Sequence, residues 1–192
     1  MSLFIKKNYE MLIIGGSAGS FPIVTKLLEK TPSNFRLPIV MCLHRLKDKP
    51  QGFKEALEIK SNLPINEPDD KDPIKVGMVF IAPSNYHLII ENKTNFSLST
   101  TELVQYSRPS IDVLFESAAE VFGSKLIAIL LSGANRDGAA GMKKIKAKGG
   151  FTVVQDPNDC SVNTMPQAAI QATQIDLILP VNDLINFIQS VH

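Results

Sequence analysis

The sequence predicts an α/β fold: a doubly wound, mostly parallel sheet with helices on both faces and a short antiparallel hairpin insert. Short, fully apolar runs recur along the chain, as expected for strands that are buried on both faces. Amphipathic stretches of about 10–12 residues separate most of these runs, which is the pattern of repeated strand–helix units. The stretch Val79–Ser99 differs, because only turn-forming residues separate its apolar pieces.

The first part of the chain contains two strand–helix units. Met11–Ile14 is predicted as a buried strand that ends at Gly15-Gly16, and Phe21–Lys30 as the helix that follows. Pro38–Leu43 is predicted as the second strand and Gly52–Asn62 as the second helix. The residues predicted to face inward are Ile23, Val24, Leu27 and Leu28 in the first helix, and Phe53, Ala56, Leu57 and Ile59 in the second.

The remaining elements include the insert and three further strands. Within Val79–Ser99, the pieces VFIAP, HLIIE and NFSLS predict three short strands with local antiparallel pairing. Leu126–Leu131 is the most apolar strand and should lie centrally. The other predicted elements are helices Ile111–Phe122, Gly138–Lys148, Met165–Thr173 and Asn182–Val191, with Asn182 as a cap, and strands Phe151–Val154 and Leu177–Leu179.

Composition narrows the class of protein further. A chain of 192 residues predicts one domain, spanning 1–192, with enough core to need no disulfide or metal. The net charge of +1 argues against a nucleic-acid binder, and two cysteines exclude a disulfide framework. No run approaches the roughly 20 apolar residues of a membrane span, and no secretory signal is visible. We therefore expect a cytoplasmic protein that binds no metal.

The segment after the first strand offers a serine as a candidate nucleophile. Gly15-Gly16-Ser17-Ala18-Gly19 matches G-x-S-x-G, which presents a hydroxyl beside a helix N-terminus. The free N–H groups of such a terminus suit a developing oxyanion. The alternative is a glycine turn in which Ser17 caps the helix. A dinucleotide fingerprint or P-loop does not fit, because the required glycines and lysine are missing.

Two further residues follow strand ends and complete a candidate triad. His44 comes directly after the second strand, where it could act as a general base, while His87 could be structural or line a cleft. Asp137 follows the strand at Leu126–Leu131; alternatively, it caps the next helix. Because strand ends of a parallel sheet share one edge, Ser17, His44 and Asp137 could form a serine-nucleophile triad. Their order along the chain excludes an α/β-hydrolase.

Taken together, these segments resemble the catalytic domain of the CheB-type chemotaxis receptor protein-glutamate methylesterases. The resemblance runs from about Met11 to Leu179. It rests on IGGSAGS, the strand-end His44, GMVFIAPSNYHL, SRPSIDVLFESAA, LSGANRDGAAGM, and GGFTVVQDP followed by Met165-Pro166. It implies Ser17 as nucleophile, His44 as base and Asp137 as the orienting acid. It also implies that backbone N–H groups at Ala18 and Ala134 bind the oxyanion.

The resemblance also implies a reaction and its partners. The expected activity is hydrolysis of glutamate γ-methyl esters on the cytoplasmic helices of a methyl-accepting chemoreceptor, with water as co-substrate and no cofactor. Deamidation of glutamine by the same chemistry is implied too. Family members usually carry a receiver domain before this one. Because only ten residues precede the first predicted strand, we expect the effector domain alone, and whether a receiver acts on it from a separate protein stays open. Ala18 and Ala134 replace the family's usual residues, which puts substrate preference in question.

Two other function classes stay open, as do the roles of three other residues. The chain could be a non-catalytic module that binds receptors or signalling proteins, or a small-molecule serine esterase. Cys42 lies two residues before His44 and could form a Cys–His pair, although a cysteine in an apolar strand is usually a buried hydrophobe. Arg108 and Arg136 are candidate contacts for an acidic receptor surface, or simply solvated.

Overall fold

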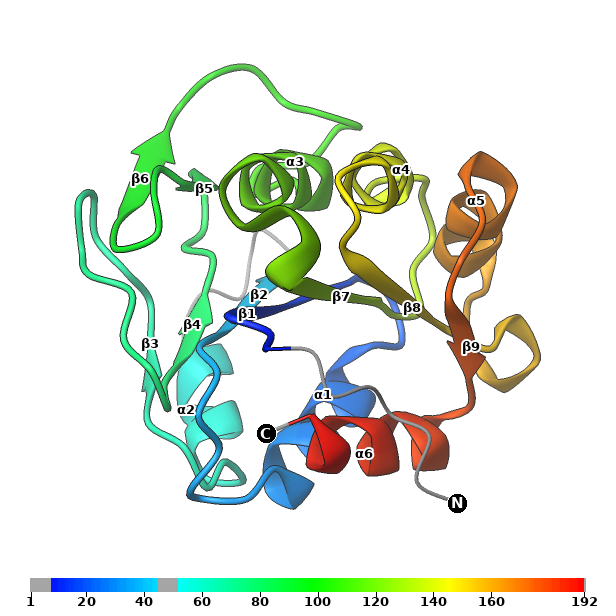
Figure 1. Ribbon diagram of the computed structural model, residues 1–192, viewed down its shortest axis with the longest axis horizontal. Coiled ribbons are helices and arrows are strands. Elements are labelled where there is room, and N and C mark those ends of the chain that lie inside the picture. The colour runs from blue at the N-terminus through cyan, green and yellow to red at the C-terminus, as the bar shows by residue number, and fades with distance from the viewer. Residues whose placement is uncertain (1–7, 45–51, 192) are drawn as a thin grey trace.

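Seven parallel strands form the main sheet, in the order β3-β4-β2-β1-β7-β8-β9 (Figure 1). The structure is a computed structural model and describes residues 8–44 and 52–191. The strands are β1 (Met11–Gly16), β2 (Ile39–Leu43), β3 (Ile65–Asn66), β4 (Val79–Ile81), β7 (Leu126–Leu130), β8 (Phe151–Gln155) and β9 (Leu177–Leu179). The antiparallel pair β5 (His87–Ile90) and β6 (Phe96–Ser99) forms a separate sheet.

Helices cover both faces of the main sheet (Figure 1). On one face lie α1 (Phe21–Lys30), α2 (Phe53–Glu58) and α6 (Val181–Ser190). On the other lie α3 (Ile111–Phe122), α4 (Ala139–Ala147) and α5 (Thr164–Ala172), together with the β5–β6 hairpin. The layers confirm the predicted fold class, and the bounds of α1 and α3 match the prediction.

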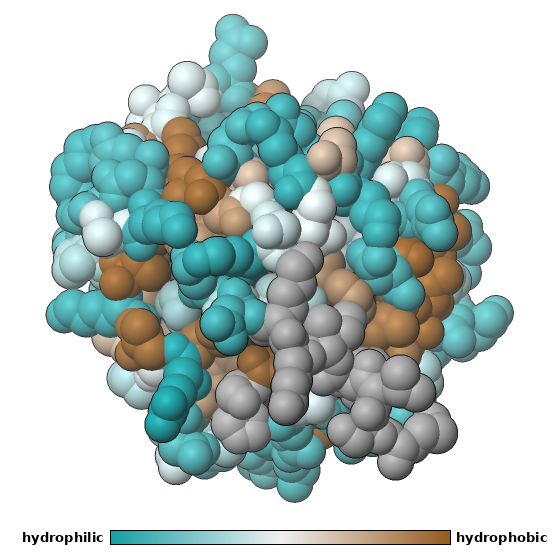
Figure 2. Space-filling view, viewed as in Figure 1, coloured by the Kyte–Doolittle hydropathy of each residue, from teal (hydrophilic) through white to brown (hydrophobic). Residues whose placement is uncertain are grey.

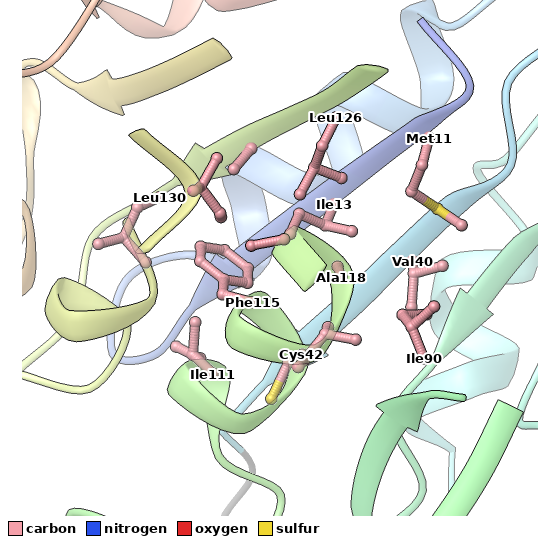
Figure 3. Close-up of a cluster of buried hydrophobic side chains, with 14 of the residues drawn as sticks. Met11, Ile13, Val40, Cys42, Ile90, Ile111, Phe115, Ala118, Leu126 and Leu130 are labelled. Atoms are coloured by element: carbon pink, nitrogen blue, oxygen red, sulfur yellow. The ribbon is translucent and has the colours of Figure 1, made fainter. Parts of the chain in front are cut away.

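The alternation of side chains along β1 explains the two cores. Met11 and Ile13 pack on the α3 side of the sheet (Figure 3). Leu12 and Ile14 pack on the α1 side. All four are at most 1% exposed. A strand that is apolar at every position is therefore required at the centre of this sheet, because both of its faces are covered. The prediction that Ile23, Val24, Leu27 and Leu28 are buried is confirmed.

Three details of the predicted fold are wrong. β4 does not pair with the hairpin but lies in the main sheet, parallel to β2 and β3, because its Val79–Ile81 run is buried on both faces. Ile59 is 80% exposed instead of inward, because α2 ends at Glu58, one turn earlier than predicted. Asn182 does not cap α6, whose N-cap is Pro180. The strand β3 was not predicted, since only two residues form it.

The surface shown in Figure 2 is largely hydrophilic, with separate hydrophobic patches between the polar side chains. Within residues 8–44 and 52–191, no helix has the length and apolar character needed to cross a membrane.

The strand order places the candidate residues at one edge. The central strand β1 lies between β2 and β7, so the chain runs outward in opposite directions from β1. Ser17, His44 and the loop that holds Asp137 follow the carboxyl ends of these three neighbouring strands. In doubly wound sheets, ligands bind at such a switch point.

Candidate active site

The carboxylate of Asp137 is fully buried and accepts hydrogen bonds on both oxygens. Oδ2 lies 2.8 Å from His44 Nε2 and accepts the Ile111 N–H at 2.7 Å. Oδ1 accepts from Ser110 Oγ at 2.8 Å, from the Asp112 N–H at 2.9 Å and from the Gly138 N–H at 3.1 Å. Five donors therefore fix the orientation of one carboxylate.

This carboxylate caps a helix, but not the one that follows it in the chain. The N-cap of α4 is Gly138, in the left-handed region with φ 92°. A Cβ there would lie 2.7 Å from Leu130 Cδ1, so only glycine allows this close approach. Asp137 instead meets the first N–H groups of α3, the residues Ile111 and Asp112. The alternative of Asp137 as the cap of the next helix is therefore wrong.

The electrostatics keep Asp137 ionised. Burial by itself raises the pKa of the Asp137 carboxyl, but hydrogen bonds from His44 and from the Asp112 and Ile111 N–H groups outweigh it, so the pKa lies below its ordinary value. The positive end of the α3 dipole acts in the same direction. An ionised carboxylate here can stabilise a protonated imidazole at His44.

His44 lies between Asp137 and the serine turn. Its side chain is 12% exposed, and its backbone N–H donates to Gly16 O at 3.0 Å, which holds it beside the end of β1. Nε2 is occupied by Asp137 Oδ2. Nδ1 is consequently the ring nitrogen left to exchange a proton with a substrate or nucleophile.

Ser17 begins the turn between β1 and α1 and is partly exposed. Its N–H donates to Ser132 O at 2.9 Å, which ties this turn to the end of β7. Within the described residues, its hydroxyl makes no hydrogen bond. The alternative in which Ser17 caps α1 is wrong, because the N-cap is Ser20, whose hydroxyl donates to Ser17 O at 2.6 Å.

Ser132 links the turn to a third loop. Its Oγ lies 2.7 Å from Ala18 O and 2.9 Å from Val162 O, and it accepts the Val162 N–H at 3.1 Å. Gly19 has φ 82°, and a Cβ there would lie 2.8 Å from Ser132 Oγ. Glycine at position 19 thus permits both the turn and its contact with Ser132.

The predicted oxyanion donors have free N–H groups. Ala18 and Ala134 are both exposed, and neither N–H donates a hydrogen bond within residues 8–44 and 52–191. Each lies in a loop at the carboxyl edge, one after β1 and the other after β7. Two such donors could bind a negatively charged oxygen.

Sequence reasoning missed the role of Ser110 and left that of His87 open. His87 is fully buried: Nδ1 accepts the Ser110 N–H at 3.2 Å and Nε2 donates to Glu102 O at 2.9 Å. Ser110 caps α3 and donates its hydroxyl to Asp137. Serine before an amphipathic run is a recognisable cap signal, but its contact with Asp137 spans 27 residues of chain.

The other residues singled out from the sequence lie in the core or nearer the surface. Cys42 is 0% exposed and lies among the apolar side chains of the α3 side (Figure 3). Arg108 Nη1 donates to Thr100 O and Thr101 O at 2.6 and 2.9 Å. Arg136 is exposed beside Asp137. No group of three potential metal ligands occurs in the described parts of the chain.

A serine hydrolase uses a hydroxyl, an imidazole and a carboxylate, and Ser17, His44 and Asp137 offer these three groups at the switch point of a parallel α/β sheet. The comparisons with known proteins give the family. The family model described as CheB methylesterase matches residues 12–188, so the chain belongs to the CheB methylesterase family.

Relatives and a solved structure agree with this assignment. A Leptospira interrogans protein, provisionally named protein-glutamate methylesterase/protein-glutamine glutaminase, is 48% identical over 90% of this chain and 89% of its own length. A Thermotoga maritima protein of the same name is 33% identical over 89% of this chain, which spans only 51% of that relative. The crystal structure of the Thermotoga maritima CheB methylesterase catalytic domain matches with a TM-score of 0.90 and 29% identity, covering 97% of this chain and all of that one.

Proposed function

We propose that this chain is a protein-glutamate methylesterase that hydrolyses glutamate γ-methyl esters of a chemoreceptor, with Ser17, His44 and Asp137 as its triad. The observation that carries the proposal is the 2.8 Å contact between His44 Nε2 and Asp137 Oδ2. Asp137 is fully buried and accepts five hydrogen bonds, and Ser17 begins its turn at the same edge of the sheet. Family membership supplies the substrate class.

In the first half of the reaction, Ser17 Oγ attacks the ester carbonyl and its proton passes to His44 Nδ1. Asp137 holds the ring through Nε2 and stabilises the imidazolium. The N–H groups of Ala18 and Ala134 bind the oxyanion. The bond to the methoxy oxygen then breaks, that oxygen takes the proton from Nδ1, and methanol leaves a glutamyl ester on Ser17.

In the second half, water repeats the same steps. It gives a proton to His44 Nδ1 as its oxygen attacks the acyl carbon, and the bond to Ser17 Oγ breaks as that oxygen regains a proton. The products are a glutamate carboxylate and free enzyme. Attack on glutamine releases ammonia in place of methanol, which gives the deamidase activity that relatives carry in their names.

The test uses a methylated chemoreceptor fragment and follows methanol release, with mass spectrometry of the fragment. We expect loss of methyl groups with the unaltered chain and none with Ser17→Ala. A fluorophosphonate probe should label the unaltered chain at Ser17. Absence of both methanol and labelling would favour a binding module of this fold, whereas turnover of small esters alone would favour a small-molecule esterase.

We also propose that residues 1–192 form a single catalytic domain and that a separate receiver protein regulates its activity. The chain spans 89% of the Leptospira interrogans relative but about half of several others. Adding a phosphorylated receiver to the methanol assay tests the proposed regulation, because a change in the rate of methanol release would show that the receiver acts on this chain.

A further inference from the structure

A cleft beside the proposed acid is not used by the mechanism above. It has a volume of about 330 Å³ and lies between α4 and the segment that joins β6 to α3. That segment arches over α3 toward α4 (Figure 1). The lining residues that matter here are Gln105, Arg136, Ala139, Ala140, Lys143 and Ala172. Because Arg136 directly precedes Asp137, the cleft lies next to the proposed site.

One face of α4 and its leading loop forms a wall of this cleft. Ala139, Ala140 and Lys143 belong to α4 and Arg136 to the loop before it, and all four line the same cleft. The two alanines are short and let another chain approach, while a cation stands at each end. Such a surface has room for a peptide segment and charge to bind it.

The two cations are available for a partner. Within the described residues, neither Arg136 nor Lys143 forms an ion pair, whereas Lys144 and Lys146 of the same helix are both paired with carboxylates. The acid that lines the cleft, Asp112, is 6% exposed and accepts the Gly141 N–H at 2.8 Å. The accessible charge of the cleft is therefore positive.

A strained hairpin forms the opposite side. The N–H of Val104 donates to Ser107 O at 3.2 Å and that of Ser107 donates to Val104 O at 2.9 Å, which closes a two-residue turn. Its central residues, Gln105 and Tyr106, have φ 48° and 62°. Positive φ at both positions is the pattern of a type I′ turn, for which asparagine and glycine are the favoured residues.

Tyr106 has no packing reason to occupy this tip, because its side chain is 92% exposed. The base of the hairpin is nevertheless braced. Arg108 donates to Thr100 O and Thr101 O, and the buried His87 donates to Glu102 O. A rigid base, a strained turn and an exposed tyrosine indicate a surface built for contact, since such strain gathers at functional sites.

We propose that this cleft and the Tyr106 hairpin bind an acidic stretch of the protein substrate that flanks the reacting glutamate. Arg136 and Lys143 take the carboxylates, and the Tyr106 ring packs on the segment. The inference rests on the proposed function and adds a substrate preference to it: esters with acidic neighbours are hydrolysed faster than esters with neutral ones.

The test compares two peptides that each carry one glutamate γ-methyl ester. One has flanking glutamates and the other has glutamines in their place, and methanol release gives kcat/KM for each. We expect the acidic peptide to be preferred by about 2- to 5-fold for each cation engaged. The preference should shrink between about 0.05 M and about 0.5 M salt, because ions screen exposed charges.

Three variants test whether the preference for the acidic peptide depends on the two cations of the cleft. Lys143→Glu and Arg136→Gln should each lower the ratio of the two kcat/KM values by about 2- to 5-fold or more. Lys26→Glu is the matched control, and the ratio should stay unchanged. Lys26 is exposed on α1, on the opposite face of the sheet, and forms no ion pair with another residue that the structure describes.

Tyr106→Gly separates docking from turn formation. Glycine relieves the positive φ, so the melting temperature should hold or rise. Loss of the ring should still raise KM for both peptides by about 3- to 10-fold. An unchanged KM, or equal turnover of both peptides at low salt, overturns this inference while leaving the methylesterase intact. If neither peptide is hydrolysed and a small ester is, the proposed function itself fails.

Discussion

Asp137 is fully buried and accepts five hydrogen bonds, whereas Ser17 begins a partly exposed turn after β1. Within the described residues, the Ser17 hydroxyl has no hydrogen-bond partner. We call Asp137 with its hydrogen-bond donors the acid side, and Ser17 with its turn the serine side. The N-terminus of α3 supplies most donors of the acid side, so this side is fixed before a substrate binds. The serine side is left open for a substrate carbonyl. Substitutions on the acid side should cost stability and activity together, while those on the serine side should cost activity alone.

The largest effect is expected from Ser17→Ala. Removal of a nucleophile that acts as part of a triad lowers kcat by about 10⁴-fold or more. Because the hydroxyl makes no hydrogen bond in the described structure, the melting temperature should stay within the range of a surface substitution. Methanol release and thermal unfolding on the same sample check both points. Near-normal turnover would show that Ser17 is not the nucleophile.

Asp137→Asn should lower both kcat and the melting temperature. Whichever way the amide is turned, its NH₂ group faces donors: either Ile111 N–H with the His44 ring, or Ser110 with two backbone N–H groups. We expect kcat to fall by about 10²–10³-fold with little change in KM, because Asp137 does not touch the substrate.

The stability cost of the same variant should be about 1–3 kcal/mol, the usual penalty for unsatisfied buried polar groups. Stability should also respond to pH in the unaltered chain. The pKa of Asp137 is lowered on folding, so its contribution is present above the unfolded value of about 3.9 and is lost as pH falls through the folded pKa. An unchanged kcat together with an unchanged melting temperature would remove Asp137 from the triad.

Substitution of His87 tests whether a residue that does not contact Asp137 still affects it through Ser110. His87→Leu leaves the Ser110 N–H and Glu102 O without their partners, and the displaced Ser110 then holds Asp137 less well. We expect kcat of the folded enzyme to fall about 10-fold, with a loss of about 1–3 kcal/mol of stability. His87→Asn keeps an acceptor near the Nδ1 position and should restore most of kcat. Equal kcat in both variants would confine His87 to a structural role.

Part of the candidate site can be predicted from the sequence. Ser17, His44 and Asp137 are candidates because each follows an apolar strand, and parallel strands end at one edge of the sheet. The role of α3 was not predictable, since Ser110 and Asp137 meet only after α3 packs on the sheet. Contacts between distant segments also explain the error at β4. Its apolar run fits either a hairpin strand or a buried parallel strand, and its pairing with β2 and β3 makes it the latter.

Asp112 carries an effect on stability that depends on pH. Burial raises the pKa of its carboxyl to about 6, and the charges of Asp137 and Glu116 add to the shift. A raised pKa means that folding favours the protonated acid, so stability is full below about 3.9 and declines as pH rises through 6. Asp112→Asn should match the unaltered chain near pH 4 and exceed it by about 1–3 kcal/mol above pH 7. A constant difference across pH would contradict this assignment.

The smallest effect is expected from Cys42→Ala, which tests whether the imidazole serves any nucleophile other than Ser17. Cys42 lies on β2, and its side chain belongs to the apolar cluster beneath α3 (Figure 3). His44 follows the carboxyl end of β2, at the edge of the sheet. Alanine removes one buried sulfur, so we expect a loss of about 1 kcal/mol of stability. Methanol release per folded molecule should not change, and labelling by a fluorophosphonate should remain at Ser17. A large loss of turnover without unfolding, together with loss of labelling at Ser17, would instead favour the thiol as the nucleophile.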